Sequence, residues 1–432
     1  MTNRLPLLMC LALLLFAGCV QRVGTASSPT SGAPVELTLF TWTEVTEQAA
    51  NQKLLTEFEQ AHPGIKVRLM NVPGSKEAMQ KLQTMMAGDT PPDVMSIHGA
   101  YYYSFAAKGT LADLGPFIAK DPAFDLDDFY PGLVQVSRWQ GKLYSLPRYT
   151  SVYTLIYNKS LFDAAGVAYP DPKQAWTWDQ YLAAAQKLTK NPGTATGTWG
   201  VYIDFWGSRL YPWLWQNNAD LMNEDRSKCV IDSPAASAAL GFVRDLRWKQ
   251  KVAPPSNAAD RNEGLNEFMQ GKIGMYMTGP WDVQTLLKKP DLRWDTAPLP
   301  VKARAATLLG TENYALSAKS AHPQEAWELY KFLLAAPSQQ FMAEQLEKMP
   351  SRKSVAEGPY LAAKSKYNRR VFVDALGYAQ QAPNLPEWDQ VAHFLQDQID
   401  LIWVNSKTVE QGLRDAARDM NASLTKIRAE KH

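Results

Sequence analysis

The sequence has few of the residues that build covalent cross-links and metal sites. Its 432 residues include 3 cysteines and 5 histidines. Cys10 and Cys19 both lie near the N-terminus, which leaves Cys229 without a partner, so no internal disulfide is expected. The histidines are scattered without the spacing of metal ligands, and we therefore predict no metal site: they are His62, His98, His322, His393 and His432.

The sequence also lacks the short motifs of three common kinds of active site. It has no H-E-x-x-H for zinc hydrolysis, no G-x-x-x-x-G-K-[S/T] for nucleotide phosphates and no G-x-S-x-G for a serine nucleophile. An excess of positive charge is missing as well, because 45 Lys and Arg stand against 43 Asp and Glu, and this balance argues against a nucleic-acid binder. We expect no catalytic residue, no cofactor and no nucleic-acid partner.

One hydrophobic run suggests contact with a membrane. It spans residues 5–16 after Arg4 and is shorter than the roughly 20 apolar residues of a membrane-spanning helix, which is typical of a secretory signal peptide, predicted here over residues 1–18. The run ends in Phe16-Ala17-Gly18-Cys19, which resembles the lipobox of bacterial lipoproteins, although Leu is commoner where Phe16 stands. The resemblance implies a lipid on Cys19. Residues 19–34 are rich in Ser, Thr, Gly, Ala and Pro, which predicts a flexible tether.

Strand and helix patterns alternate in the first part of the remaining chain. About 400 residues remain, more than one hydrophobic core usually spans, so two lobes are expected. Apolar residues alternate over 35–39 and 65–69, an apolar run follows at 93–97, and helical spacing occurs over 50–58 and over 79–86, where Ser75 is a possible cap. This order predicts an α/β fold with a parallel sheet.

The later part of the chain is predicted to be richer in helix. Thr177 and Gln180 form a capping box, and Ser233 precedes a helix that begins with Pro234. Residues 273–277 form a short apolar strand that ends in Gly-Pro-Trp. Apolar stripes over 388–399 and 413–420 predict two C-terminal helices, the second capped by Thr408.

Six segments carry a resemblance to a known family. They are Phe-Glu-Gln-Ala-His-Pro-Gly-Ile-Lys-Val at 58–67, Pro-Asp-Val at 92–94, Tyr-Asn-Lys-Ser-Leu-Phe at 157–162, Phe-Met-Gln-Gly-Lys-Ile-Gly-Met at 268–275, Gly-Pro-Trp at 279–281 and Ala-Trp-Glu at 326–328. In this order they make the chain similar, over 35–424, to the family 1 extracellular solute-binding proteins, which include maltose- and multiple-sugar-binding proteins.

The resemblance implies a periplasmic-binding-protein-like fold, in which two α/β lobes close over a ligand in the cleft between them. It implies one lobe from residues 35–149 plus 301–354 and another from 150–300 plus 355–432. The hinge segments would cross near 150–153, 298–300 and 355–360. It further implies an exported, membrane-anchored monomer that delivers its ligand to the permease subunits of an ABC importer.

Three predicted strands end beside side chains that suit a ligand site. In open α/β sheets ligands bind beyond the carboxyl ends of strands, and a sugar ring, with apolar faces and polar edges, suits aromatic platforms with a few polar groups. Trp281 is the strongest candidate because family members place a stacking aromatic at this position; packing beneath the hinge is its alternative. Trp42 has the alternative of filling its own lobe. The candidates at these strand ends are Trp42, Glu44, His98, Tyr101 and Trp281.

Further candidates come from loops and from the resemblance. They are Arg148, Ser151, Asp204, Trp206, Glu312, Asn313 and Arg352. Arg148 and Ser151 lead into the first expected crossing, where the family often has a polar ligand contact, but Arg148 equally suits a surface ion pair. Arg352 is often cleft-facing in relatives. Trp388 shares a stripe with core residues, which favours packing over ligand contact.

The residues leave several functions open. The resemblance favours capture of a carbohydrate, a di- or oligosaccharide, for an ABC importer. A sugar phosphate, a polyol or another small solute is the alternative within the same fold. A glycosidase would need two carboxylates about 5–9.5 Å apart, for which Glu44, Asp204 and Glu312 are the candidates. A purely structural lipoprotein or adhesin is a third class.

Overall fold

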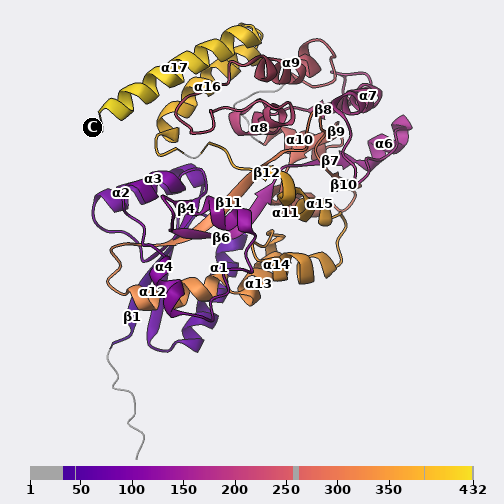
Figure 1. Ribbon diagram of the computed structural model, residues 1–432. Helices are drawn as coiled ribbons and strands as arrows, with labels where there is room; N and C mark the ends of the chain where they lie inside the picture. Colours follow the sequence, from indigo (N-terminus) through magenta and orange to yellow (C-terminus); the bar gives the residue numbers. More distant parts are fainter. Residues whose placement is uncertain (1–32, 44, 256–261, 384, 431–432) are drawn as a thin grey trace, which may run out of the picture.

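The computed structural model describes residues 33–43, 45–255, 262–383 and 385–430. The chain forms two lobes, one above the other in Figure 1. Cys19, the predicted signal peptide, most of the predicted tether and Glu44 lie outside the described residues. Within the described part of the chain, no helix is long and apolar enough to cross a membrane.

The lower lobe is built on a six-stranded sheet. Its strands run in the order β12-β11-β3-β1-β2, with β6 also paired to β11. The predicted parallel pairing holds for β1 with β2 and with β3, whereas β11 runs antiparallel to both β3 and β6, so the sheet is mixed. The strands are β1 (Val35–Thr41), β2 (Ile65–Asn71), β3 (Val94–His98), β6 (Ser145–Val152), β11 (Thr307–Leu316) and β12 (Ala379–Gln380).

Helices from two parts of the chain, residues 45–136 and 323–355, belong to this lobe. Helix α2 begins at Ser75 itself, and Gly74 occupies the N-cap with φ 82, so the prediction that Ser75 caps the helix is wrong by one residue. A glycine adopts this left-handed backbone without steric cost. The helices are α1 (Val45–Ala61), α2 (Ser75–Ala87), α3 (Tyr102–Ala107), α4 (Gly115–Lys120), α5 (Pro131–Val136), α12 (Pro323–Leu334), α13 (Ala336–Leu346) and α14 (Lys353–Val355); a two-stranded hairpin, β4 (Arg138–Trp139) and β5 (Lys142–Leu143), follows α5.

The upper lobe has a smaller sheet under more helices (Figure 1). The capping box of Thr177 and Gln180 is confirmed, as are the caps at Ser233 and Thr408. Its strand order is β10-β7-β9-β8, from β7 (Thr154–Asn158), β8 (Trp199–Tyr202), β9 (Ile273–Thr278) and β10 (Trp294–Ala297). Its helices are α6 (Lys159–Ala165), α7 (Trp178–Leu188), α8 (Gly207–Gln216), α9 (Pro234–Trp248), α10 (Glu263–Met269), α11 (Pro280–Leu287), α15 (Arg370–Ala375), α16 (Trp388–Trp403) and α17 (Val409–Ala429).

Each lobe has its own hydrophobic core, and most aromatic rings belong to one of them. In the lower lobe the ring centroid of Phe58 lies 5.4 Å from that of Phe332 on α12, and Trp327 belongs to the same cluster. In the upper lobe Trp178 lies edge-on to Trp213, at 5.5 Å between ring centroids, and Phe205 stacks on the α16 residue Trp403. Most aromatic residues at 205–213 therefore belong to the core, and the exception is Trp206, which is 39% exposed.

Two segments link the sheets closely. A single residue, Tyr153, separates β6 of the lower sheet from β7 of the upper sheet, and residues 298–306 lead from β10 back to β11. A third hydrophobic cluster lies around these links and includes Val152, Ile156 and Leu309. The lobe boundaries given above stay a prediction.

Candidate ligand-binding cleft

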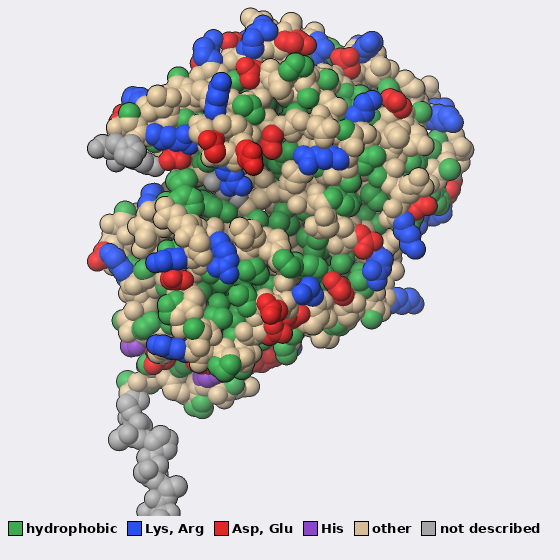
Figure 2. Space-filling view, viewed as in Figure 1, with side chains coloured by type: hydrophobic (Ala, Val, Ile, Leu, Met, Phe, Trp, Pro, Cys, Tyr) green, Lys and Arg blue, Asp and Glu red, His purple; other side chains and the backbone are tan. Residues whose placement is uncertain are grey.

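Two adjoining cavities lie where the lobes meet, and Figure 2 shows the molecule hollowed there. The first, of about 310 Å³, is called here the hinge cavity, and the second, of about 350 Å³, the carboxylate cavity. Both are lined by His98, Ser151, Trp281, Gly310 and Thr311, so they form one continuous site. Five of the predicted residues thus line this site: His98, Ser151 and Trp281 in both cavities, and Trp42 and Glu312 in the second.

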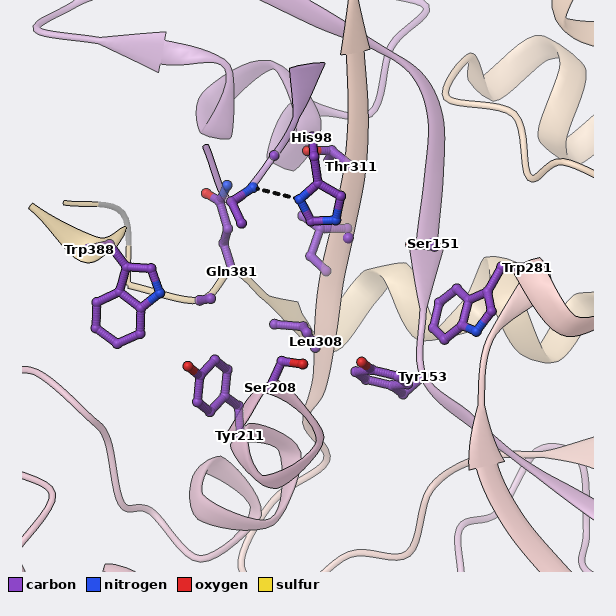
Figure 3. Close-up of a pocket in the computed structure, with 15 residues that line it drawn as sticks. His98, Ser151, Tyr153, Ser208, Tyr211, Trp281, Leu308, Thr311, Gln381 and Trp388 are labelled. Atoms are coloured by element: carbon purple, nitrogen blue, oxygen red, sulfur yellow. Dashed lines mark hydrogen bonds between the residues drawn. The ribbon is translucent and has the colours of Figure 1, made fainter. Parts of the chain in front are cut away.

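The hinge cavity is walled by aromatic rings and uncharged polar groups. Figure 3 shows Tyr153 and Trp281 on one side of it and Tyr211 and Trp388 on the other. Ser208 and Gln381 add a hydroxyl and an amide. No Asp, Glu, Lys or Arg is among its described lining residues. This lining can stack on apolar faces and exchange hydrogen bonds with hydroxyl groups.

Local sequence explains how Trp281 faces the cavity. Strand β9 ends at Thr278, Gly279 is the N-cap of α11, and Pro280 opens the helix. A Cβ atom on residue 279 would lie 2.2 Å from the Trp281 ring, so only glycine permits this close approach. The indole is 42% exposed and meets Tyr153 edge-on, at 5.2 Å between centroids.

An arginine lies behind these two rings. The Arg209 guanidinium carbon is 4.8 Å from the Tyr153 ring centroid and 5.8 Å from that of Trp281. It donates to the backbone carbonyl of Met277 at 2.6 Å and pairs with Asp204 at 3.3 Å. Burial raises the pKa of Asp204. Asp204, predicted to contact ligand, lines neither cavity and instead holds the arginine that supports the aromatic wall.

His98 is a neutral hydrogen-bonding group at the junction of the two cavities. Burial lowers its pKa to about 4. The backbone N–H of Ala100 donates to Nδ1 at 3.2 Å, drawn dashed in Figure 3, which leaves Nε2 to carry the proton. Its ring lies 5.6 Å from Trp42, which lines the carboxylate cavity, and 6.1 Å from Tyr101, which lines neither.

The carboxylate cavity has a charged floor. Arg148 is 1% exposed and donates to Glu47 at 2.8 Å, while also pairing closely with Glu312. Lys348 pairs with the other oxygen of Glu47 at 2.8 Å. Burial raises the pKa of Glu47, but Arg148 and Lys348 outweigh it and hold that pKa below its ordinary value. Arg148 itself lines neither cavity, so the structure gives it two carboxylates in place of the predicted ligand contact.

Two polar atoms on β11 have no partner within the described part of the chain. They are Oγ1 of Thr311 and Oδ1 of Asn313, both buried. Thr311 lines both cavities, whereas Asn313, a predicted contact, lines neither. A buried hydroxyl without a partner costs free energy, so Thr311 is suited to bond a ligand.

Two further predicted residues lie apart from the cavities. Arg352 is 7% exposed and donates to the carbonyl of Leu334 at 2.6 Å and to Asp128 at 3.1 Å, because a buried guanidinium requires such partners. The expectation of a cleft-facing Arg352 is therefore not met by this geometry. Trp206 is the N-cap residue of α8, 39% exposed, and is not a lining residue of either cavity.

Several lining residues escaped the sequence-based prediction. Tyr153 lay within the expected first crossing, which was a usable signal. Ser208 and Tyr211 lie on α8, and their place on the hinge cavity could be predicted only if the orientation of that helix were known. Lys348 is distant in sequence from every strand end on the cavity and carried no signal. Glu47 was overlooked although it follows shortly after Thr41, where β1 ends beside the cavity.

Comparisons with known proteins agree with this architecture. An arabinooligosaccharide-binding protein of Bacillus subtilis is 27% identical over 346 residues, 77% of this chain and 76% of that protein. An ABC substrate-binding protein of Listeria monocytogenes, solved with cycloalternan, superposes with a TM-score of 0.82 at 27% identity, covering 91% of this chain and 99% of the other. A maltose-bound protein of T. maritima gives 0.76 at 25% identity, with 89% and 99% covered. The model of the bacterial extracellular solute-binding proteins matches residues 42–340, and the chain belongs to this family.

Proposed function

We propose that this protein binds an uncharged carbohydrate, a di- or oligosaccharide, between its lobes and delivers it to the permease of an ABC importer. The observation that carries the proposal is the hinge cavity, in which four aromatic rings face hydroxyl and amide groups with no charged side chain among the described lining. Sugar rings offer apolar C–H faces to such rings and hydroxyls to such polar groups.

The names of relatives support a sugar as the ligand. Among the proteins similar to this chain are binders of arabinooligosaccharides and of galactooligosaccharides, and structures solved with cycloalternan and with maltose. They differ in the sugar, so they favour the class of ligand and leave its identity to measurement.

Charge pairing in the carboxylate cavity argues against a phosphorylated ligand. Lys348 is the one cation among its described lining residues, and Glu47 already neutralises it. Arg148 is shared by Glu47 and Glu312. A phosphate entering here would meet two carboxylates and no unpaired cation, which disfavours it electrostatically.

The same pairing argues against glycoside hydrolysis. A glycosidase needs one carboxyl group with a raised pKa as the general acid. Glu47 has a lowered pKa, and both Glu47 and Glu312 are held by Arg148. We infer that these carboxylates accept hydrogen bonds from ligand hydroxyls rather than transfer protons.

Membership in an extracellular family supports export. We propose in addition that Cys19 carries a lipid and that residues 19–34 form a tether. We also propose that the protein is a monomer whose two lobes, divided as the resemblance implies, close over the ligand. Detergent partitioning of wild type and Cys19→Ala tests the anchor: a variant that still partitions as a lipoprotein contradicts it. Small-angle scattering tests closure: a radius of gyration that does not fall with ligand contradicts it.

A thermal-shift and calorimetry panel tests the ligand class. Neutral arabino-, galacto- and malto-oligosaccharides and glucose 1-phosphate serve as probes. A neutral sugar is expected to raise the melting temperature, since a ligand at about 100 times its Kd stabilises by about 2.7 kcal/mol. Stabilisation by the phosphate alone would overturn the uncharged ligand. No response to any sugar would favour the adhesin class, and cleaved products would favour an enzyme.

A further inference from the structure

A third cavity, of about 760 Å³, continues the cleft beyond the hinge cavity and is called here the distal compartment. Gln381 lines both it and the hinge cavity, so the two are adjacent. Its walls come from opposite lobes: α3 and the β4–β5 hairpin below, and residues 225–226, 385–387 and Arg428 of α17 above. In Figure 1, α3 and β4 lie on the side of the lower lobe that faces the upper lobe.

The lower wall is an aromatic shelf held in place by its neighbours. Trp139 meets Tyr103 edge-on at 5.7 Å between centroids, and the Tyr103 hydroxyl donates to the carbonyl of Val136 at 2.8 Å. The hairpin turn is tight, with Gln140 at φ 47 and Gly141 at φ 80, and Arg138 donates to the carbonyl of Gly141 at 3.1 Å. These contacts fix the ring positions before any ligand arrives.

The upper wall is polar. Arg428 donates to the backbone carbonyls of Ser227 at 2.9 Å and Arg226 at 3.2 Å, and Asp225 accepts from the backbone N–H of Ser227 at 2.9 Å. Asp225 and Arg226 thus line the compartment from a loop that these hydrogen bonds hold, and Arg428 lines it from α17. Like the hinge cavity, the compartment combines aromatic rings with hydrogen-bonding groups. Unlike the hinge cavity, it also has charged residues in its lining, which can exchange hydrogen bonds with sugar hydroxyl groups: Arg138, Asp225, Arg226, Glu387 and Arg428.

We propose that the distal compartment binds the sugar units of an oligosaccharide that extend beyond the hinge and carboxylate cavities, so that the ligand is longer than a disaccharide. This rests on the proposed function. The two inner cavities, at about 310 and 350 Å³, already lie in the range that encloses a small ligand of disaccharide size. A disaccharide held there leaves the distal compartment unfilled, whereas a tetrasaccharide would lay its outer units against Trp139.

Calorimetry with matched di- and tetrasaccharides tests this extension. Each pair shares one linkage: maltose with maltotetraose, and the arabinose and galactose equivalents. The tetrasaccharide of the preferred series is expected to bind about fivefold tighter or more than its disaccharide, since one well-packed aromatic contact is worth over 1 kcal/mol. Ala107→Trp fills the compartment from an exposed position on its rim and should bring the tetrasaccharide affinity down to that of the disaccharide.

Ala107→Ser is the matched control and should retain the tetrasaccharide advantage. Trp139→Ala should reduce that advantage by removing the aromatic surface itself. Melting temperatures verify that each variant is folded. Equal affinity of wild type for both lengths overturns the extension while leaving the proposed function intact, as does an unchanged advantage in folded Ala107→Trp. Binding of neither length overturns the proposed function itself.

Discussion

The hinge cavity and the carboxylate cavity share a strand but differ in charge. Residues 308–311 of β11 line the hinge cavity beside four aromatic rings, and residues 310–312 line the carboxylate cavity beside Glu47 and Lys348. A ligand along β11 therefore meets stacking surfaces at one end and ionised groups at the other. If the protein binds a sugar as proposed, we expect the first cavity to supply affinity through ring contact and the second to orient hydroxyl groups and reject anions.

The charged floor also has a structural role that the aromatic wall lacks. Arg148 joins α1, β6 and β11 through Glu47, Glu312 and Tyr314. Trp281 has its ring 42% exposed and joins nothing of this kind. Truncating Arg148 should consequently lower the stability of the fold, whereas truncating Trp281 should lower the affinity for ligand.

The largest expected effect is on stability, from Arg148→Met. The change leaves the partly buried Glu312 without its cation and Glu47 with Lys348 alone, and breaking a buried ion pair in this way costs about 3–5 kcal/mol. Denaturant melts at neutral pH measure the loss. Arg370→Met is the control, because its pair with Asp374, at 3.8 Å and about half exposed on both sides, should contribute at most about 0.5 kcal/mol. Equal effects of the two changes would refute the structural role of the floor.

The next effect is on affinity, from Trp281→Ala. Truncating an aromatic anchor typically costs about 2 kcal/mol or more, so sugar affinity by calorimetry should fall about thirty-fold. Stability should change little, since the ring is partly exposed. Trp215→Ala, at a residue 1% exposed, is the opposite case and should cost about 3–5 kcal/mol of folding free energy. If Trp281→Ala kept full affinity but lost much stability, the ring would serve the hydrophobic core rather than the ligand.

A smaller effect distinguishes His98, which both cavities share, from Glu47 of the carboxylate cavity by the pH at which each loses its contribution to stability. The folded-state pKa of His98, about 4, lies below its ordinary value of 6.5, so the stability it contributes is fully present above pH 6.5 and is lost as pH falls towards 4. The folded-state pKa of Glu47 lies below its ordinary value of 4.5. The stability that its ionised carboxylate contributes is therefore fully present above pH 4.5 and is lost only as the pH falls below that value.

Denaturant midpoints of His98→Gln and Glu47→Gln, measured from pH 8 to pH 3, separate the two windows. His98→Gln should remove a decline of about 1–2 kcal/mol between pH 6.5 and 4, less than the full shift implies because the ring keeps some solvent contact. Glu47→Gln should flatten the profile below pH 4.5 alone. A His98 variant with the wild-type slope in the upper window would contradict the buried, neutral imidazole.

The sequence predicted the local elements better than the site. Strand alternation and caps such as Thr177 and Thr408 depend on neighbours a few residues away, so they could be predicted directly. Trp281 could be placed because Gly279 and Pro280 fix the turn before it. Arg148 could not, since its two carboxylate partners lie 101 and 164 positions away along the chain, and only the folded sheet brings them together. The resemblance placed residues 301–354 in the first lobe, but the antiparallel pairing of β11 with β3 and β6 was missed for the same reason.

The smallest expected effect concerns Thr311, the residue that both cavities share. Its hydroxyl is buried without a partner in the described structure, so Thr311→Val should leave stability unchanged or raise it slightly. Affinity should fall by about 1 kcal/mol, roughly five-fold, because a ligand hydroxyl loses its hydrogen bond. Thr296→Val is the control: its hydroxyl donates to the carbonyl of Asn368 at 2.7 Å, away from both cavities, so stability should fall by about 1 kcal/mol and affinity should not change. A Thr311 variant that loses stability and keeps full affinity would mean that the hydroxyl serves the fold, and that the ligand contacts the two cavities through their other shared residues.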